Sequence, residues 1–174
     1  MNKTNIELKH YCSNFTAIRK ALKEIGAKKE GVKEQTDYYF ELPNDKARLK
    51  LRVEEKRQQL VYYERPDFSK NKGTVAKIKL YDVRDRQLLP FLRFALGVKV
   101  IVKKKREIWR RSNTVFHLDN VKDAGFIFEI ELQKKGKITP ADKKQFKIYS
   151  GKVMPYLGKV IKGSNADLVI LASK

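Results

Sequence analysis

Polar and apolar residues alternate strictly at several places along this chain of 174 residues. The first such place is 5–9, where Asn5, Glu7 and Lys9 are separated by two aliphatic residues. Because successive side chains of a β-strand point to opposite faces, we expect these three on one face. The alternation returns at 48–52 and 128–132. Since charges of both signs recur at the same parity, the ionic faces of several strands are expected to converge on one another.

Eight segments carry a strand-like pattern, and most of the connections between them are short. This spacing favours antiparallel pairing and closure into a barrel. The predicted strands cover 5–9, 36–42, 48–53, 59–65, 75–81, 98–109, 115–121 and 126–133.

Helical periodicity interrupts the strands at three places. Apolar residues share one helical face over 15–25, and Gly26 provides a stop. A short helix is expected to begin near Pro90 and end at Gly97. A longer helix is predicted over 140–158, with Thr139 as its cap. We therefore predict an α+β fold, an eight-stranded antiparallel β-barrel with peripheral helices. Residues 1–174 are expected to form a single domain, with the helix 140–158 packed outside.

The charge balance of the chain is strongly basic. Lys and Arg number 40 against 20 Asp and Glu, a formal charge of +20, while 41% hydrophobic residues indicate a folded protein. Such a charge attracts nucleic acid, an anionic membrane surface or a phosphate-rich small molecule. The lone Cys12 cannot form an intramolecular disulfide, and no apolar run approaches the ~20 residues of a membrane span. We expect a cytoplasmic protein.

Inward-pointing polar faces would place many charges inside the barrel. Burial of charge is unfavourable unless the charges are paired, hydrated or bound to a ligand. Because the expected cations outnumber the carboxylates, the natural complement is a ligand with several closely spaced negative charges. A triphosphate with Mg²⁺ or Mn²⁺ fits, since carboxylates bind the metal while Arg and Lys bind phosphate oxygens. The interior set is Glu7, Lys9, Arg48, Lys50, Arg52, Arg65, Lys104, Arg106, Asp119, Glu129 and Glu131.

An ordered series of short blocks resembles the CYTH family, the triphosphate tunnel metalloenzymes that include class IV adenylyl cyclases and thiamine triphosphatases. The resemblance runs nearly from end to end. It rests on the blocks at 5–9, 37–40, 48–52, 60–66, 96–97, 104–106, 117–119, 125–131 and 163–168. Two positions depart from the family pattern. Asn5 stands at the first acidic position of the signature, and Asn165 replaces the aromatic residue of the closing element.

The resemblance implies a barrel whose tunnel binds triphosphate and metal, and it assigns roles to the interior residues. The metal ligands would be Glu7, Asp119, Glu129 and Glu131. The triphosphate would be bound by Lys9, Arg48, Lys50, Arg52, Arg65, Lys104 and Arg106. The catalytic residues would be Glu7, Lys9, Glu129 and Glu131.

Three functions are compatible with this site. The first is a divalent-metal-dependent hydrolase of inorganic triphosphate or of an organic or nucleoside triphosphate. The second is a class IV-type adenylyl cyclase that makes cyclic AMP and pyrophosphate from ATP. The third is a non-catalytic binder of polyphosphate or nucleic acid, which the carboxylates disfavour because they repel anions. Since the tunnel accounts for little of the net charge, the basic exterior is a possible site for a further polyanion. The sequence leaves the oligomeric state open.

Overall fold

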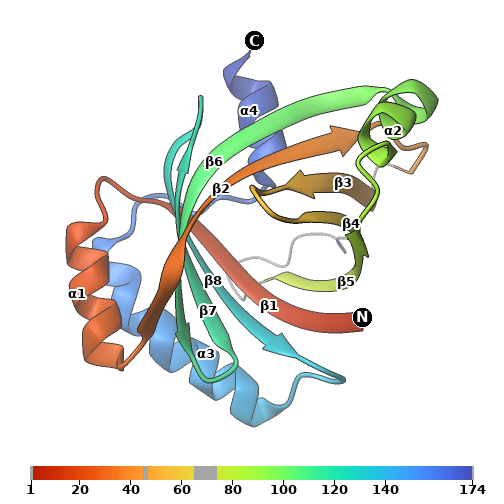
Figure 1. Ribbon diagram of the computed structural model, residues 1–174. Coiled ribbons are helices and arrows are strands. Elements are labelled where there is room, and N and C mark those ends of the chain that lie inside the picture. Colours follow the sequence, from red (N-terminus) through yellow and green to blue (C-terminus); the bar gives the residue numbers. More distant parts are fainter. Residues whose placement is uncertain (1, 45–46, 65–73, 174) are drawn as a thin grey trace.

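Eight antiparallel strands form a closed, barrel-like sheet (Figure 1). The computed structural model describes residues 2–44, 47–64 and 74–173. The ladders follow the cyclic order β1-β5-β4-β3-β2-β6-β7-β8, and β8 pairs again with β1. This arrangement confirms the predicted fold class. The strands are β1 (Asn2–Tyr11), β2 (Lys28–Phe40), β3 (Ala47–Val53), β4 (Gln58–Glu64), β5 (Thr74–Val83), β6 (Val98–Arg111), β7 (Thr114–Val121) and β8 (Gly125–Lys134).

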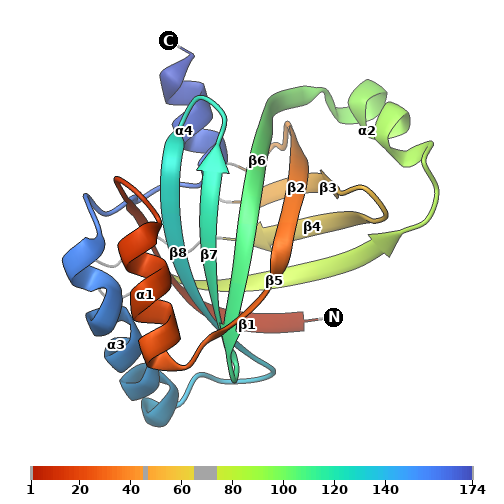
Figure 2. The same ribbon diagram turned by 60° about the vertical axis from the view of Figure 1, so that its left-hand side comes forward.

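Helices cover the barrel from outside. They are α1 (Thr16–Ile25), α2 (Leu88–Leu96), α3 (Pro140–Val153) and α4 (Asn165–Ala172), with a short 3-10 turn, η1 (Met154–Tyr156). The helices α1 and α3 lie side by side, and α2 lies on the opposite side (Figure 2). No helix among the described residues is long and apolar enough to cross a membrane.

The predicted ends of the first two helices agree with the structure. The left-handed Gly26 (φ 78°) ends α1, and Gly97 ends α2. The predicted helix 140–158 is too long, since α3 begins after the Thr139 cap but stops at Val153. Pro155 has no N–H to continue the helical hydrogen bonds, so the chain tightens into η1 and then leaves the helix.

Two elements differ from the sequence prediction. The strand β2 starts at Lys28, eight residues before the predicted start at 36. Its first half is mostly exposed and lacks apolar alternation, and pairing with β6 holds it extended. The helix α4 was not predicted as a helix. The sequence does contain a signal for a helix start there, because Ser164 and Asp167 form a capping box at the first turn of α4.

The main hydrophobic cores lie outside the barrel, between the strands and the helices. The outer faces of β1, β6, β7 and β8 pack against α1 and α3, with Phe116, Phe128 and Ile130 fully buried. A second core, which includes Leu51 and Leu92, lies under α2. Because the apolar faces of the strands are used on the outside, the alternation leaves polar side chains for the interior.

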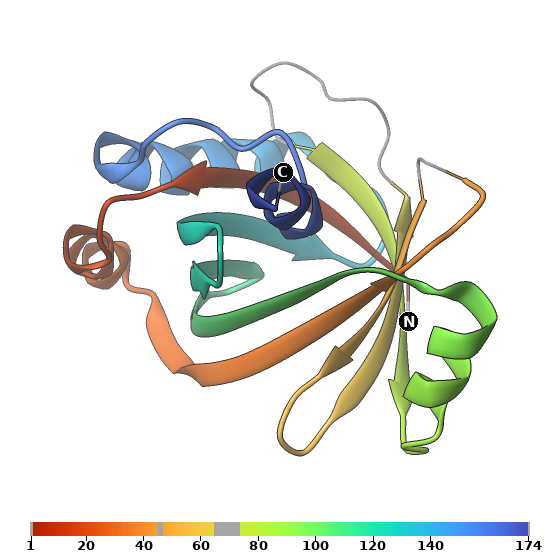
Figure 3. The same ribbon diagram turned by 90° about the horizontal axis from the view of Figure 1, so that it is seen from above.

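A third apolar cluster closes one end of the barrel. The inward-facing side chains Tyr39, Val102 and Ile127 meet there with Ala166 and Val169 of α4. The helix stands over this end (Figure 3). This apolar cluster therefore fills the barrel interior at the α4 end.

Candidate active site

The barrel encloses a polar cavity of about 330 Å³. It is lined by side chains of one parity from β1, β2, β3, β4, β5, β6, β7 and β8, as the alternation predicts. Several of the residues assigned to the site from the sequence line it together. These are Glu7, Lys9, Lys50, Arg52, Lys104, Arg106, Glu129 and Glu131.

One wall of the cavity, which we call the basic wall, is built by β2, β3 and β6 around Asp37. This carboxylate is fully buried. It accepts a hydrogen bond from Lys50 Nζ at 2.8 Å and from Lys104 Nζ at 3.0 Å. Arg52 donates to both of its oxygens, at 2.8 and 3.1 Å. Three cations are thus gathered around one carboxylate.

The basic wall perturbs the titration of its own groups. Burial would raise the pKa of Asp37, but the charges of Arg52, Lys104 and Lys50 outweigh it and hold that pKa well below its usual value. Burial lowers the pKa of Lys104 to about 8, against the opposing charge of Asp37. Burial and the charge of Arg52 also lower the pKa of Lys50. The charge of Asp37 therefore does not offset the burial of the two lysines, and a bound anion would stabilise their charged forms.

The opposite wall, which we call the acidic wall, is built by β1, β7 and β8. Glu7 and Glu131 stand opposite each other on neighbouring strands. Lys9 Nζ lies 3.5 Å from a Glu129 oxygen, and His117 Nε2 lies 3.3 Å from Glu131. Asn5 donates its side-chain amide to Glu131. These contacts hold the carboxylates facing the cavity.

Glu129 and Glu131 of the acidic wall remain ionised. Burial would raise the pKa of Glu129, but the charges of Lys9 and Arg106 hold it well below its usual value. Burial would also raise the pKa of Glu131, which the hydrogen bond with His117 lowers instead. The wall therefore presents negative oxygens at neutral pH.

Arg106 joins the two walls. Its guanidinium donates to both Asp119 oxygens, at 2.7 and 2.5 Å, and to Glu129 at 3.1 Å. Burial would lower the pKa of Arg106, but Asp119 and Glu129 raise it, so the side chain stays charged. Arg106 thus presents a fixed cation beside the carboxylates.

The donor set of the acidic wall fits a divalent metal ion that is shared with a phosphate ligand. Carboxylate and amide oxygens are hard donors, and Asn5 Oδ1 is buried without a hydrogen-bond partner among the described residues. Within those residues, no three or more His, Cys, Asp or Glu side chains are grouped to hold a metal ion alone. Mg²⁺ commonly takes one or two protein carboxylates and completes its shell with phosphates and water.

Comparison with known proteins adds to this geometry. The family model of the CYTH domain matches residues 3–151. The chain belongs to the CYTH domain family. No curated protein gives a significant match.

Solved structures share the CYTH fold over nearly the whole chain. PH1012 of Pyrococcus horikoshii OT3 is 28% identical, with a TM-score of 0.76 over 95% of this chain and 99% of that one. HpAC1 of Hippeastrum is a candidate adenylyl cyclase with a dominant triphosphatase activity. It is 14% identical, with a TM-score of 0.65 over 97% of this chain and 95% of that one. A candidate adenylate cyclase of Vibrio parahaemolyticus is 14% identical, with a TM-score of 0.71 over 95% of this chain and 97% of that one.

Three of the residues assigned from the sequence lie apart from the cavity lining of this CYTH domain or outside the described residues. Asp119 is fully buried behind Arg106. Arg48 is turned toward α4, where its guanidinium lies 3.6 Å from Asp167. Arg65 falls outside the residues that the structure describes.

Sequence reasoning missed several residues of the CYTH cavity. Asp37 was noticed only as part of a family block, although it shares its strand parity with Tyr39, which lines the cavity. His117 belongs to the family block 117–119 and is not among the site residues assigned from the sequence, yet it lines the cavity beside Glu131. The tunnel lining also contains Tyr63, Gln59, Gln133, Ser164 and Asn165.

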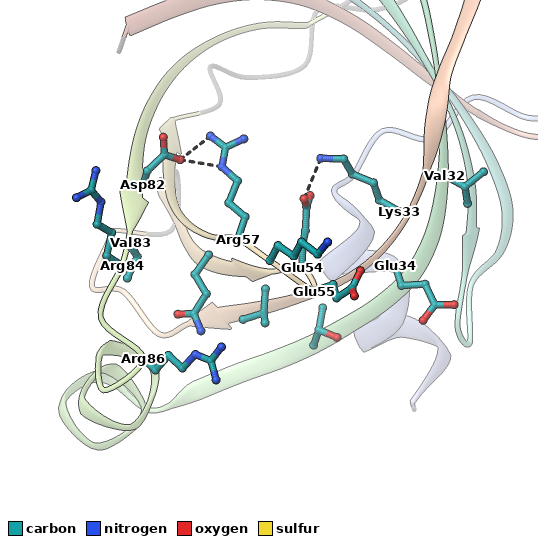
Figure 4. A pocket seen from close by; sticks show the side chains of 14 residues that line it. Val32, Lys33, Glu34, Glu54, Glu55, Arg57, Asp82, Val83, Arg84 and Arg86 are labelled. Atoms are coloured by element: carbon teal, nitrogen blue, oxygen red, sulfur yellow. Dashed lines mark hydrogen bonds and ion pairs between the residues drawn. The ribbon is translucent and has the colours of Figure 1, made fainter.

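The end of the tunnel away from α4 opens toward a wide cleft of about 1280 Å³ (Figure 4). Its lining comes from β2, from the turn between β3 and β4, and from the end of β5. Arg57 lines both this cleft and the tunnel, and it is held by Asp82 at 2.5 Å. Lys33 donates to Glu54 at 2.9 Å across the same cleft. This charged end offers an entrance for an anionic ligand.

Proposed function

We propose that this CYTH domain is a divalent-metal-dependent hydrolase of a triphosphate substrate bound inside the tunnel. One observation carries the proposal: a single cavity is lined by the basic wall on one side and by the acidic wall on the other. A ligand that combines a polyanion with a divalent cation satisfies both walls, whereas either ion alone would satisfy only one.

The basic wall would hold the phosphate oxygens. Lys50, Arg52 and Lys104 are positioned by Asp37 before any ligand binds. Such preorganised cations stabilise the charge of a phosphoryl-transfer transition state without rearranging during the reaction. Arg106 and Lys9 would approach the triphosphate from the acidic side, where each is held by Glu129.

The acidic wall would hold Mg²⁺ or Mn²⁺ through Glu7, Glu129 and Glu131. When bound, such an ion neutralises phosphate charge and lowers the pKa of a coordinated water. The pairing of Glu129 with Lys9 and Arg106 fixes the direction of its oxygens. Asn5 and His117 do the same for Glu131. A carboxylate of this wall would also accept the proton of the attacking water.

The dimensions of the tunnel favour a small substrate. A cavity of about 330 Å³ lies near the lower limit of small-molecule sites, which begin at roughly 300 Å³. Inorganic triphosphate, or the triphosphate part of a larger molecule that projects into the cleft, matches this volume. The dominant triphosphatase activity of HpAC1, which has the same fold, agrees with hydrolysis as the reaction.

Analysis of the products by phosphorus NMR tests the proposal. The pure protein is incubated with inorganic triphosphate and, separately, with ATP, each with Mg²⁺ or Mn²⁺. Orthophosphate and diphosphate from inorganic triphosphate are the expected products, and they should disappear when a chelator removes the metal. Cyclic AMP with pyrophosphate from ATP would instead identify an adenylyl cyclase. Two unchanged substrates would reject both enzymes and leave a non-catalytic binder.

A further inference from the structure

The helix α2 is apolar on its outer side as well as on its inner side. Leu88, Leu92 and Leu96 pack in the core under the helix. Phe91 and Phe94 are three positions apart, so they lie together on the opposite side. Phe91 is 64% exposed and Phe94 is 92% exposed. Because a helix that is hydrophobic all round is normally buried, the outer side of α2 calls for a partner.

Tyr81 of β5 borders the same helix. It stands beside Leu60 in the β4–β5 ladder and shares a strand face with Val83, and both of these residues pack in the core under α2. Tyr81 is 69% exposed, so Phe94, Tyr81 and Phe91 are three of the four most exposed large hydrophobic side chains among the described residues. Such a cluster marks a surface that binds a protein or a membrane. We call these three residues the α2 patch.

Cations surround the α2 patch. Arg84 and Arg86 come just before α2 and Arg93 lies within it, and all three are exposed. The acidic residue between them, Asp85, turns toward the start of the helix, where its side chain accepts a backbone N–H at 2.8 Å. The patch therefore combines aromatic side chains with positive charge, and its complement is an anionic surface.

This charge disfavours a second copy of the chain as the partner. In a two-fold contact, the same surface of both copies would meet, so the three arginines of one copy would face those of the other. Each copy also carries a formal charge of +20. Like charges that are brought together across an interface oppose association.

The size of the patch also disfavours a protein partner. The nine residues of α2 form a helix about 14 Å long and about 10 Å wide. Its outer side is therefore far smaller than the ~800 Å² that each partner contributes to a standard protein–protein interface. A lipid surface needs no matching shape, because aromatic side chains enter the headgroup region while nearby Lys and Arg attract anionic lipids.

We propose that the α2 patch docks on an anionic membrane surface, with Phe91, Phe94 and Tyr81 among the headgroups and the neighbouring arginines against the lipid charge. This property belongs to the exterior of the barrel and is independent of the proposed function. The segment 83–86 contributes Val83 and Arg86 to the lining of the wide cleft and leads into α2 (Figures 1 and 4). Docking therefore brings the entrance of the tunnel close to the lipid surface.

Tryptophan fluorescence tests the contact directly. Phe94→Trp places a fluorescent side chain of similar character on the patch, and the protein's own Trp109 is 5% exposed and gives a constant background. Leu171→Trp is the matched control, because Leu171 is 67% exposed on α4. Each protein is mixed with vesicles of phosphatidylcholine alone and with vesicles that also contain phosphatidylglycerol. Sedimentation with the vesicles measures the affinity.

The emission of Phe94→Trp should shift to the blue with the anionic vesicles only, and that of Leu171→Trp should stay constant. The double variant Phe91→Ala/Phe94→Ala should sediment with anionic vesicles more than about 10-fold less tightly than the wild type, since two aromatic side chains lose their burial. Its melting temperature should be unchanged. Arg86→Gln/Arg93→Gln should also weaken binding, whereas Lys144→Gln/Lys147→Gln on α3 should weaken it less.

Three results would overturn the proposal. One is the absence of a blue shift for Phe94→Trp, and another is equal affinity of the wild type and the double phenylalanine variant for anionic vesicles. Equal binding of the wild type to both kinds of vesicle would remove the role of the arginines. A dimer in gel filtration that Phe91→Ala/Phe94→Ala converts to a monomer would assign the α2 patch to a second copy instead.

Discussion

The two walls of the tunnel differ in the sign of the charge that predominates on each. On the basic wall, Lys50, Arg52 and Lys104 share the single carboxylate of Asp37. On the acidic wall, the carboxylates outnumber the Lys9 amine that faces them, and Arg106 adds a cation from the side. In the ion pairs of the described residues, cations therefore predominate on the basic wall and carboxylates on the acidic wall. This difference supports the proposal that a ligand with both signs of charge completes the interior, because walls that served stability alone would be expected to neutralise themselves.

The strongest way to break this asymmetry is to remove charge from the acidic wall. Glu131→Gln keeps the shape of the side chain but removes a negative donor beside Glu7. We expect metal-dependent hydrolysis of triphosphate to fall by more than ~100-fold, because metal affinity depends on charged ligands. Steady-state rates with titrated Mg²⁺ measure this, and Glu129→Gln should behave alike.

Glu24→Gln is the matched control for these variants, since Glu24 is exposed on α1. Its rate should equal that of the wild type. Wild-type rates for Glu131→Gln and Glu129→Gln would mean that the acidic wall does not hold the metal.

The next largest effect is expected from the anchor of the basic wall. Asp37→Asn leaves two buried lysines and the partly buried Arg52 without their shared carboxylate, and breaking a buried pair in this way costs about 3–5 kcal/mol of stability. The free variant should therefore melt at a lower temperature, and KM for triphosphate should change more than kcat. Added triphosphate should recover part of the lost stability, because its negative charge takes the place of the carboxylate.

Thermal melts with and without triphosphate make that comparison. An equal loss of stability in both conditions would give Asp37 a purely structural role.

Titration of the basic wall offers a smaller and more specific effect. The pKa of Lys104 is lowered to about 8 in the folded protein, so this amine is largely neutral above that pH. A bound polyanion favours the charged amine, so binding should take up a proton and weaken as the pH rises through about 8. In the protein without ligand, pH has the opposite effect on folding stability. The unfolded chain keeps the Lys104 proton up to a higher pH than the folded chain does, so the free energy of unfolding increases as the pH rises above 8.

Lys104→Arg tests this dependence, since a guanidinium stays charged over the same range. Calorimetry in buffers of different ionisation enthalpy should detect proton uptake in the wild type and less of it in the variant. Identical proton uptake in both proteins would assign the titration to another group.

The smallest effect is expected outside the tunnel. Lys143, Lys144 and Lys147 are exposed on α3 and are not among the described residues that line the cavity. Their replacement by glutamine should leave the turnover of triphosphate within about 2-fold at physiological salt, where charges beyond ~8 Å are screened. A large fall in kcat/KM that high salt abolishes would make the outer charge part of substrate capture.

Much of the interior could be predicted because strand alternation is a local signal. Once Glu7 and Lys9 are placed on one face, the same parity on β8 selects Glu129 and Glu131 without knowledge of the pairing. The neighbours that an inward side chain meets depend on strand pairing, which is not a local signal. Asp119 has the inward parity, but its position behind Arg106 depends on the register between β6 and β7.

Asp37 and Asn165 show a second limit of the sequence. Asp37 lies among aromatic residues that suggest a core strand, and only the folded barrel brings Lys104, 67 positions away, to its carboxylate. Asn165 belongs to a helix of eight residues, which is too short for a clear periodic pattern. The contacts that place both residues at the tunnel, Asp37 with Lys104 and α4 with β6, are distant in sequence.

The position of β1 between β5 and β8 has a consequence for how the protein is made. The register that sets Glu7 against Glu131 joins the first strand of the chain to the last strand of the barrel. During synthesis, the edge of β1 that pairs with β8 therefore stays unpaired until β8 has been made. Contacts of such long sequence separation form slowly. Until β8 pairs with β1, the sheet stays open at that edge. The pairing of β8 with β1 closes the barrel and assembles the acidic wall in the same step. A chain that ends before β8 therefore has neither a closed barrel nor an acidic wall.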